Sequence, residues 1–200
     1  MLNQVYATKV SMTQTFAHGK RIPLTVLTVE PHVVIRNKNV EKDGYSAVLL
    51  SVGKKNHEIL TSEDLDIKSE VNLAELLVPG TTVSVTSKSK GKGTSGVMKR
   101  WGMHGGPRTH GQSDRGRAPG SIGRGTTPGR VLPGKHMAGR MGNENTCIRN
   151  LKVHSYNPET RMLQITGAIS GGRGAVAKIT ITKQAVAAAP AIAEETNQQI

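Results

Sequence analysis

The sequence has few of the side chains that build disulfide frameworks or aromatic cores. Its 200 residues contain one cysteine (Cys147), one tryptophan (Trp101) and one phenylalanine (Phe16). A single cysteine has no partner within the chain, which excludes the disulfide framework of small secreted domains. No apolar run approaches the roughly 20 residues that a membrane-spanning helix needs. The first residues show neither a basic segment nor a long apolar one, so we expect no secretory signal and a cytoplasmic protein.

Acidic side chains are scarce in the middle third of the chain. The whole sequence has a net charge of +13. Between Lys88 and Lys152, six lysines and eight arginines are accompanied only by Asp114 and Glu144, so these 65 residues carry +12. Fifteen of the 23 glycines lie in the same segment. A basic, glycine-rich insert in a nearly neutral chain predicts a polyanionic partner, of which nucleic acid is the commonest.

The nearly neutral remainder has the pattern of short β-strands. Runs rich in β-branched residues are separated by turn signals, with no sustained helical period. The predicted strands are Ile22–Glu30, Tyr45–Val52, Thr82–Thr86, Cys147–Val153, Met162–Ile169 and Ala177–Thr182. The segment Val71–Leu77 fits a strand or a short helical turn equally well. We expect an antiparallel barrel or sandwich, with a mixed α+β domain as the alternative.

The expected organisation is one β domain interrupted by an arm. Residues 1–87 form the first part of the domain, 88–145 the extended glycine-rich arm and 146–186 the last strands. Residues 187–200 form a tail that is disordered or a marginal helix. The arm has too few large aliphatic side chains to offset the entropy of ordering it, so we expect it to fold against another molecule. Its contour, on the order of 210 Å, would let it reach deep into a large particle.

The composition of the arm favours folded RNA. Arginine binds phosphate bidentately and stacks on bases, and glycine allows the backbone to approach a sugar–phosphate surface closely. No helix-turn-helix, basic zipper or zinc-finger spacing is present, so no helix is a candidate for reading a DNA groove. With Trp101 as the only aromatic residue of the arm, shape and phosphate contacts would dominate binding.

Several short motifs do not support catalysis. Gly91, Gly93 and Gly96 match the dinucleotide-binding fingerprint, but no long helix pattern or suitably spaced acidic residue follows. The histidines and Cys147 match no zinc spacing. We therefore expect no catalytic residue, no cofactor, no metal, no small-molecule substrate and no membrane partner.

Strings of residues along the arm resemble the universal large-subunit ribosomal protein L3 family in its bacterial form. They are Thr86–Gly93, Gly96–Gly102, Thr109–Gly111, Arg117–Gly123, Thr127–Arg130 and Gly134–Glu144, in the order of the family. The similarity covers most of residues 5–183. It implies a mainly β fold: an antiparallel β-barrel of the translation-protein type with a long irregular basic extension.

The resemblance also implies a function. Family members are structural, non-enzymatic constituents of the large ribosomal subunit that touch neighbouring ribosomal proteins. They bind rRNA directly, nucleate assembly near its 3′ end and extend a loop toward the peptidyl transferase centre, where residues around Ser121–Pro128 would lie. The family has in some bacteria a methylated glutamine at the position of Arg124, so that modification should be absent here.

The residues that we expect to contact rRNA lie in the arm and at its two ends. They are Lys88, Lys90, Lys92, Lys99, Arg100, Trp101, His104, Arg108, His110, Arg115, Arg117, Ser121, Arg124, Arg130, Lys135, His136, Arg140 and Arg149. Two other functions remain open from the residues alone. One is a general histone-like nucleic-acid-binding protein, and the other is a flavin- or nucleotide-using enzyme on a similar barrel.

Overall fold

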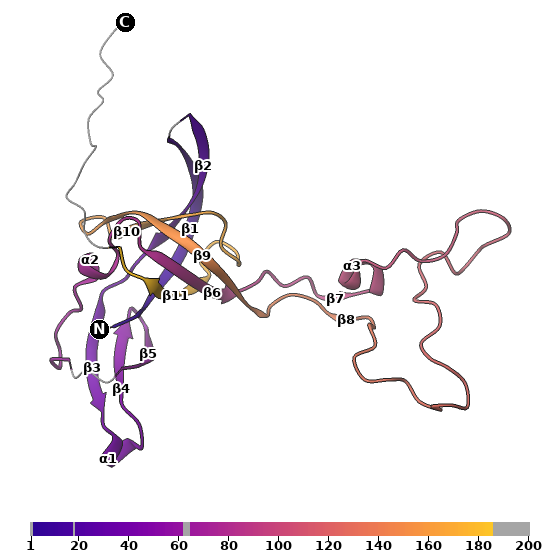
Figure 1. Ribbon diagram of the computed structural model, residues 1–200, viewed down its shortest axis with the longest axis horizontal. Coiled ribbons are helices and arrows are strands. Elements are labelled where there is room, and N and C mark those ends of the chain that lie inside the picture. Colours follow the sequence, from indigo (N-terminus) through magenta and orange to yellow (C-terminus); the bar gives the residue numbers. More distant parts are fainter. Residues whose placement is uncertain (1, 18, 62–64, 186–200) are drawn as a thin grey trace, which may run out of the picture. The chain divides into compact units, whose positions relative to one another are not determined.

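A computed structural model describes residues 2–17, 19–61 and 65–185. Its elements are β1 (Gln4–Ala17), β2 (Lys20–Thr28), β3 (His32–Lys38), α1 (Val40–Asp43), β4 (Ala47–Val52), β5 (Lys55–Leu60), α2 (Leu73–Leu76), β6 (Thr82–Lys88), β7 (Thr94–Ser95), α3 (Val97–Trp101), β8 (Gly139–Arg140), β9 (Asn145–Asn157), β10 (Met162–Thr166) and β11 (Val176–Lys183) (Figure 1). The mainly β, antiparallel class is confirmed. The predicted tail, 187–200, lies outside the described residues.

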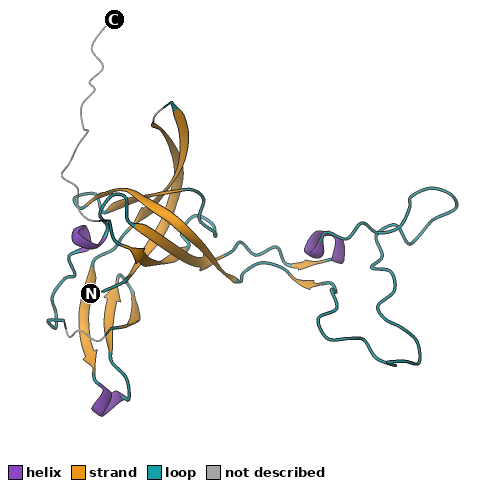
Figure 2. Cartoon of the chain, in the orientation of Figure 1, coloured by secondary structure: helices purple, strands orange, loops and turns teal. Residues whose placement is uncertain are grey.

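Two compact units make up the chain. One consists of the described residues up to Lys88 together with those from Asn145 to 185, and the other is Ser89–Glu144. Strands dominate the first unit, whereas the second is mostly loop (Figure 2). Among the described residues, no helix is both long enough and apolar enough to cross a membrane.

The first unit contains a closed ring of six antiparallel strands in the order β1-β11-β6-β9-β10-β2, with β2 pairing back onto β1. The alternation of inward and outward side chains along each strand explains how its core forms. In β6, Val83 and Val85 are fully buried while their neighbours face outward, and β10 does the same with Leu163 and Ile165. Burial of these branched side chains, at roughly 1.5–3 kcal/mol each, is the main force that closes the barrel.

A second antiparallel sheet, in the order β3-β4-β5, belongs to the same unit. Its inward side chains Val34, Val48, Leu50 and Ile59 are buried, and they join the barrel residues in a single apolar cluster. The sheet and the barrel therefore share one core.

The ambiguous segment Val71–Leu77 contains the short helix α2. The Asn72 side-chain oxygen accepts a hydrogen bond of 3.2 Å from the Ala74 N–H, which caps the helix N-terminus. Leu73, Leu76 and Leu77 are buried. Helix α1 ends at Gly44, because this residue adopts the left-handed conformation that terminates helices.

Candidate RNA-binding arm

The second unit, residues 89–144, is called the arm below. It leaves the barrel between β6 and β9, whose ends pair at Lys88 and Asn145. Just beyond, the Ser89 N–H donates to the Glu144 carbonyl at 2.9 Å, and β7 pairs with β8. Its two legs, residues 89–102 and 136–144, thus form a short ladder that we call the stem.

A cluster around Trp101 joins the two legs of the stem. The Trp101 indole N–H and an Arg100 guanidinium N–H both donate to the Met137 carbonyl, at 2.9 and 3.0 Å. The Trp101 ring stacks on His136 with centroids 3.9 Å apart and planes at 2°. The Arg100 guanidinium carbon lies 5.0 Å from the centre of the indole. Aromatic stacking adds about 0.5–1.5 kcal/mol beyond area burial, so this contact gives the stem structure of its own.

Gly142 is required where the two legs approach most closely. Its φ is +75°, a conformation that side chains rarely adopt, and a Cβ there would collide with the Lys90 carbonyl oxygen. This glycine therefore serves the internal packing of the arm.

Beyond the stem, residues 103–135 form a region that we call the distal loop, with no helix or strand. Backbone hydrogen bonds link parts of it, such as the one of 3.2 Å from the Gly106 N–H to the Gly116 carbonyl. No side chain within 103–135 is buried, and even Ile122 and Leu132 are about half exposed, at 48% and 58%. The distal loop has no core of its own.

The predicted rRNA-contacting residues fall into three groups, and all are exposed except the half-buried Arg100. Lys88 and Arg149 lie on β6 and β9; Lys90, Lys92, Lys99, Arg100, Trp101, His136 and Arg140 lie on the stem; His104, Arg108, His110, Arg115, Arg117, Ser121, Arg124, Arg130 and Lys135 lie on the distal loop. The role of each in contacting RNA stays a prediction.

Several of these residues already have partners within the arm, among them Arg100, which donates to the Met137 carbonyl. Trp101 and His136 stack on one another, and the Ser121 hydroxyl donates to the Gly123 carbonyl at 2.9 Å. No sequence pattern indicates the Trp101–His136 pair or the Met137 carbonyl as an acceptor, because both depend on which residues of the two legs lie opposite one another.

The cations of the arm lack counter-charges. Within residues 89–144, all of which the structure describes, no lysine or arginine forms an ion pair with a carboxylate. Eleven lysines and arginines are accompanied there by only Asp114 and Glu144. Repulsion among exposed like charges disfavours a compact arm and favours association with an anionic surface.

These observations define a class: a mainly β protein that presents an exposed, uncompensated cationic insertion. Within the described part of the chain, no group of three or more His, Cys, Asp or Glu side chains is placed to hold a metal ion.

Comparison with known proteins identifies the family. The model of the family "Ribosomal protein L3" matches residues 20–173. The large ribosomal subunit protein uL3 of Dehalococcoides mccartyi is 41% identical over 203 aligned residues, covering 91% of this chain and 99% of that protein. The corresponding proteins of Herpetosiphon aurantiacus and Thermobifida fusca are 37% and 40% identical, covering 90% and 85% of this chain and 96% and 90% of theirs.

The chain belongs to the ribosomal protein L3 family, in its bacterial form. It is therefore a structural, non-enzymatic constituent of the large ribosomal subunit, located in the cytoplasmic ribosome. The resemblance found in the sequence is confirmed, and the enzyme alternative is set aside.

Proposed function

We propose that the arm binds large-subunit rRNA directly, helps to nucleate assembly near the 3′ end of that RNA and extends its distal loop toward the peptidyl transferase centre. The observation that carries this proposal is the set of exposed cations in residues 89–144, none of which pairs with a carboxylate there. RNA is the polyanion of the large subunit, and its phosphates can supply the missing counter-charges.

Binding would proceed by counterion release and shape fit. The stem gives the arm an ordered base. The distal loop has no apolar core, and it would acquire one conformation through contacts with the phosphates of RNA helices. Neighbouring large-subunit proteins would contact the barrel unit.

The test measures binding of the full chain to transcripts of the 3′ and 5′ portions of bacterial large-subunit rRNA. With about eight phosphate contacts, affinity for the 3′ transcript should fall by roughly 10³–10⁵ between 50 and 200 mM salt. The 3′ transcript should be bound more tightly than the 5′ transcript or duplex DNA. Equal affinity for all three would instead indicate general histone-like binding.

A charge-matched pair of variants assigns the binding to the arm. Replacing Arg115, Arg117 and Arg130 by glutamine should reduce the slope of log affinity against log salt by about three. Replacing Arg21, Arg161 and Arg173 of the barrel unit, also exposed, should leave the slope unchanged. The same loss in both variants would contradict the proposal.

A further inference from the structure

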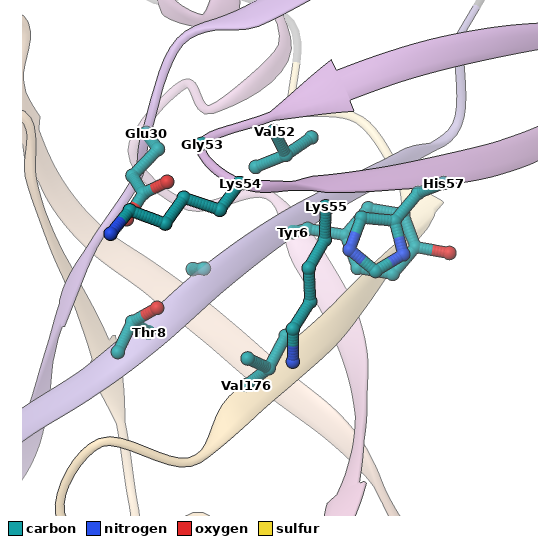
Figure 3. A pocket seen from close by; sticks show the side chains of 10 residues that line it. Tyr6, Thr8, Glu30, Val52, Gly53, Lys54, Lys55, His57 and Val176 are labelled. Carbon is teal, nitrogen blue, oxygen red and sulfur yellow. The ribbon is translucent and has the colours of Figure 1, made fainter.

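A cavity of about 370 Å³ is lined by residues of the barrel unit. One wall is β1 from Tyr6 to Thr8, and another is the turn between β4 and β5 from Val52 to Lys55. Glu30, His57 and Val176 complete the lining (Figure 3). Its volume is within the range of sites that bind small ligands.

The aromatic side of the cavity has a fixed position. The rings of Tyr6 and His57 stack with centroids 3.8 Å apart and planes at 15°. The Tyr6 backbone N–H donates to His32 Nε2 at 2.9 Å, so Nδ1 carries the imidazole proton and donates to the Glu30 carbonyl at 2.8 Å. His32 is completely buried. The buried His32 side chain, with both ring nitrogens hydrogen-bonded, therefore fixes the backbone of Tyr6, one member of the stacked pair.

The cavity holds both cationic and anionic groups. Lys54 and Lys55 are exposed, and within the described residues neither ammonium group has a hydrogen bond or an ion pair. Figure 3 shows the two lysines extending in different directions, Lys54 toward Glu30 and Lys55 toward Val176. The ammonium groups suit a phosphate, while the Glu30 carboxylate accepts hydrogen bonds only.

Gly53 brings the turn between β4 and β5 over Glu30. Its φ is +59°, and a Cβ at this position would collide with the Glu30 carboxylate. The Glu30 carboxylate therefore lies beside the turn that carries the two lysines.

A nucleotide has a chemical group to match each part of the cavity lining. Its phosphate fits the Lys55 ammonium, its sugar can contact the Thr8 hydroxyl, and its flat base suits a site bordered by Val52, Val176 and the Tyr6–His57 pair. A simple anion would gain nothing from the carboxylate. Among RNA bases, guanine offers two adjacent N–H donors on its pairing edge, which match the two oxygens of a carboxylate.

We propose that this cavity binds one unstacked guanine nucleotide of a single-stranded RNA segment, with its phosphate on Lys55 and its base edge on Glu30. Unpaired RNA nucleotides are commonly bound in this way, with the base splayed out against protein side chains and read at its pairing edge. The proposal goes beyond the function of the arm and does not depend on it.

The test is a titration of the full chain followed by NMR, using the ring signals of Tyr6 and His57 as local reporters. The probes are the pentaribonucleotides UUGUU and UUAUU, with guanosine monophosphate as a third probe. UUGUU should shift both ring signals and bind the cavity about tenfold more tightly than UUAUU. No shift, or equal affinity for the two pentanucleotides, would overturn the proposal. Equal affinity for the free mononucleotide would overturn the assignment to RNA.

Variants separate the proposed contacts. Replacing Lys55 by alanine should abolish the shifts, whereas replacing the exposed Lys20 removes the same charge and should preserve them. Glu30→Gln should keep binding but lose the preference for guanine, because an amide offers one acceptor and one donor group. Persistence of the preference in Glu30→Gln would contradict the role of Glu30. The glutamine variant of Arg115, Arg117 and Arg130 should leave the shifts intact, so failure at the cavity and failure at the arm are distinguishable.

Discussion

His32 connects two segments of the barrel unit through a single buried ring. Its two nitrogens hydrogen-bond the backbone of Tyr6 on β1 and of Glu30 before β3. Burial is the main cause that lowers the pKa of His32, and burial together with the charge of Lys55 lowers that of His57. A protonated His32 would also lose the acceptor that the Tyr6 N–H needs.

Replacing His32 by leucine should destabilise the protein substantially. The change leaves the Tyr6 N–H and the Glu30 carbonyl without their partner inside the protein, and each unsatisfied buried group costs about 1–3 kcal/mol. We expect urea unfolding to show a loss of about 2–5 kcal/mol. The exposed His154 on β9 provides the matched control, His154→Leu, which should change stability by much less.

The variants His32→Leu and His154→Leu also test how stability depends on pH. Because the folded pKa of His32 lies below that of the unfolded chain, the unfolded state binds protons more readily. The contribution of His32 is complete well above pH 6.5 and is lost as the pH falls below that value. Wild type and His154→Leu should weaken from pH 7.5 to pH 5, and His32→Leu should weaken less. An equal decline in all three would contradict this explanation.

At the scale of elements, the stem is the part of the arm whose stability can be measured separately. Trp101 is the only tryptophan in the chain, so tryptophan fluorescence reports on the stem alone. Gly142 lies in the same ladder, with a backbone conformation that strains any other residue.

Gly142→Ala should loosen the stem without unfolding the barrel. Strain of this kind costs about 1–3 kcal/mol. We expect the fluorescence transition of Trp101 in urea to move to a lower concentration, while the far-ultraviolet circular dichroism of the strands keeps its midpoint. Gly125→Ala is the control, since no atom lies within 4 Å of a Cβ there and its φ is not positive. Identical behaviour of the two variants would exclude a structural role for Gly142.

The sequence predicted those strands whose apolar alternation is strong. The expected Thr82–Thr86 and Ala177–Thr182 lie within β6 and β11, where buried valine and isoleucine alternate with polar residues. It missed β1, β3 and β5, as well as the two-residue strands β7 and β8. The outer half of β1 is exposed on both faces, with Phe16 at 70%, so its residues carry no burial pattern. Such a strand forms because β2 pairs with it. This pairing cannot be predicted from the residues of β1 alone.

The candidate sites were predictable to different extents. The cationic arm is visible in the sequence because charge and glycine content are local properties. The cavity was not, since Tyr6, Glu30 and Lys54 are separated along the chain and meet only through the shared core of the two sheets. Neither Glu30 nor the two lysines have an unusual sequence context.

At the scale of the whole molecule, charge and core are segregated. The apolar cluster belongs to the barrel unit, whereas the arm carries most of the net charge, +9 in residues 89–144. Local opening costs little free energy where few apolar side chains are buried and few backbone groups are hydrogen-bonded. The two units should therefore differ strongly in stability.

Amide hydrogen exchange on the free protein should show this difference as three levels. The core strands β6, β10 and β11 should exchange most slowly, because they lie within the closed ring and carry buried side chains. The stem should be intermediate, owing to its ladder and the Trp101–His136 stack. The distal loop, residues 103–135, should exchange fastest and be cleaved first by protease.

Adding the 3′ rRNA transcript should change only part of this pattern. If the distal loop is ordered by RNA phosphates, its amides should become protected at 50 mM salt and lose that protection at high salt, while the barrel strands stay as they were. The variant with glutamine at Arg115, Arg117 and Arg130 should show weaker protection at the same RNA concentration. A distal loop already protected in the free protein would contradict coupled folding, because its order would then not depend on the RNA.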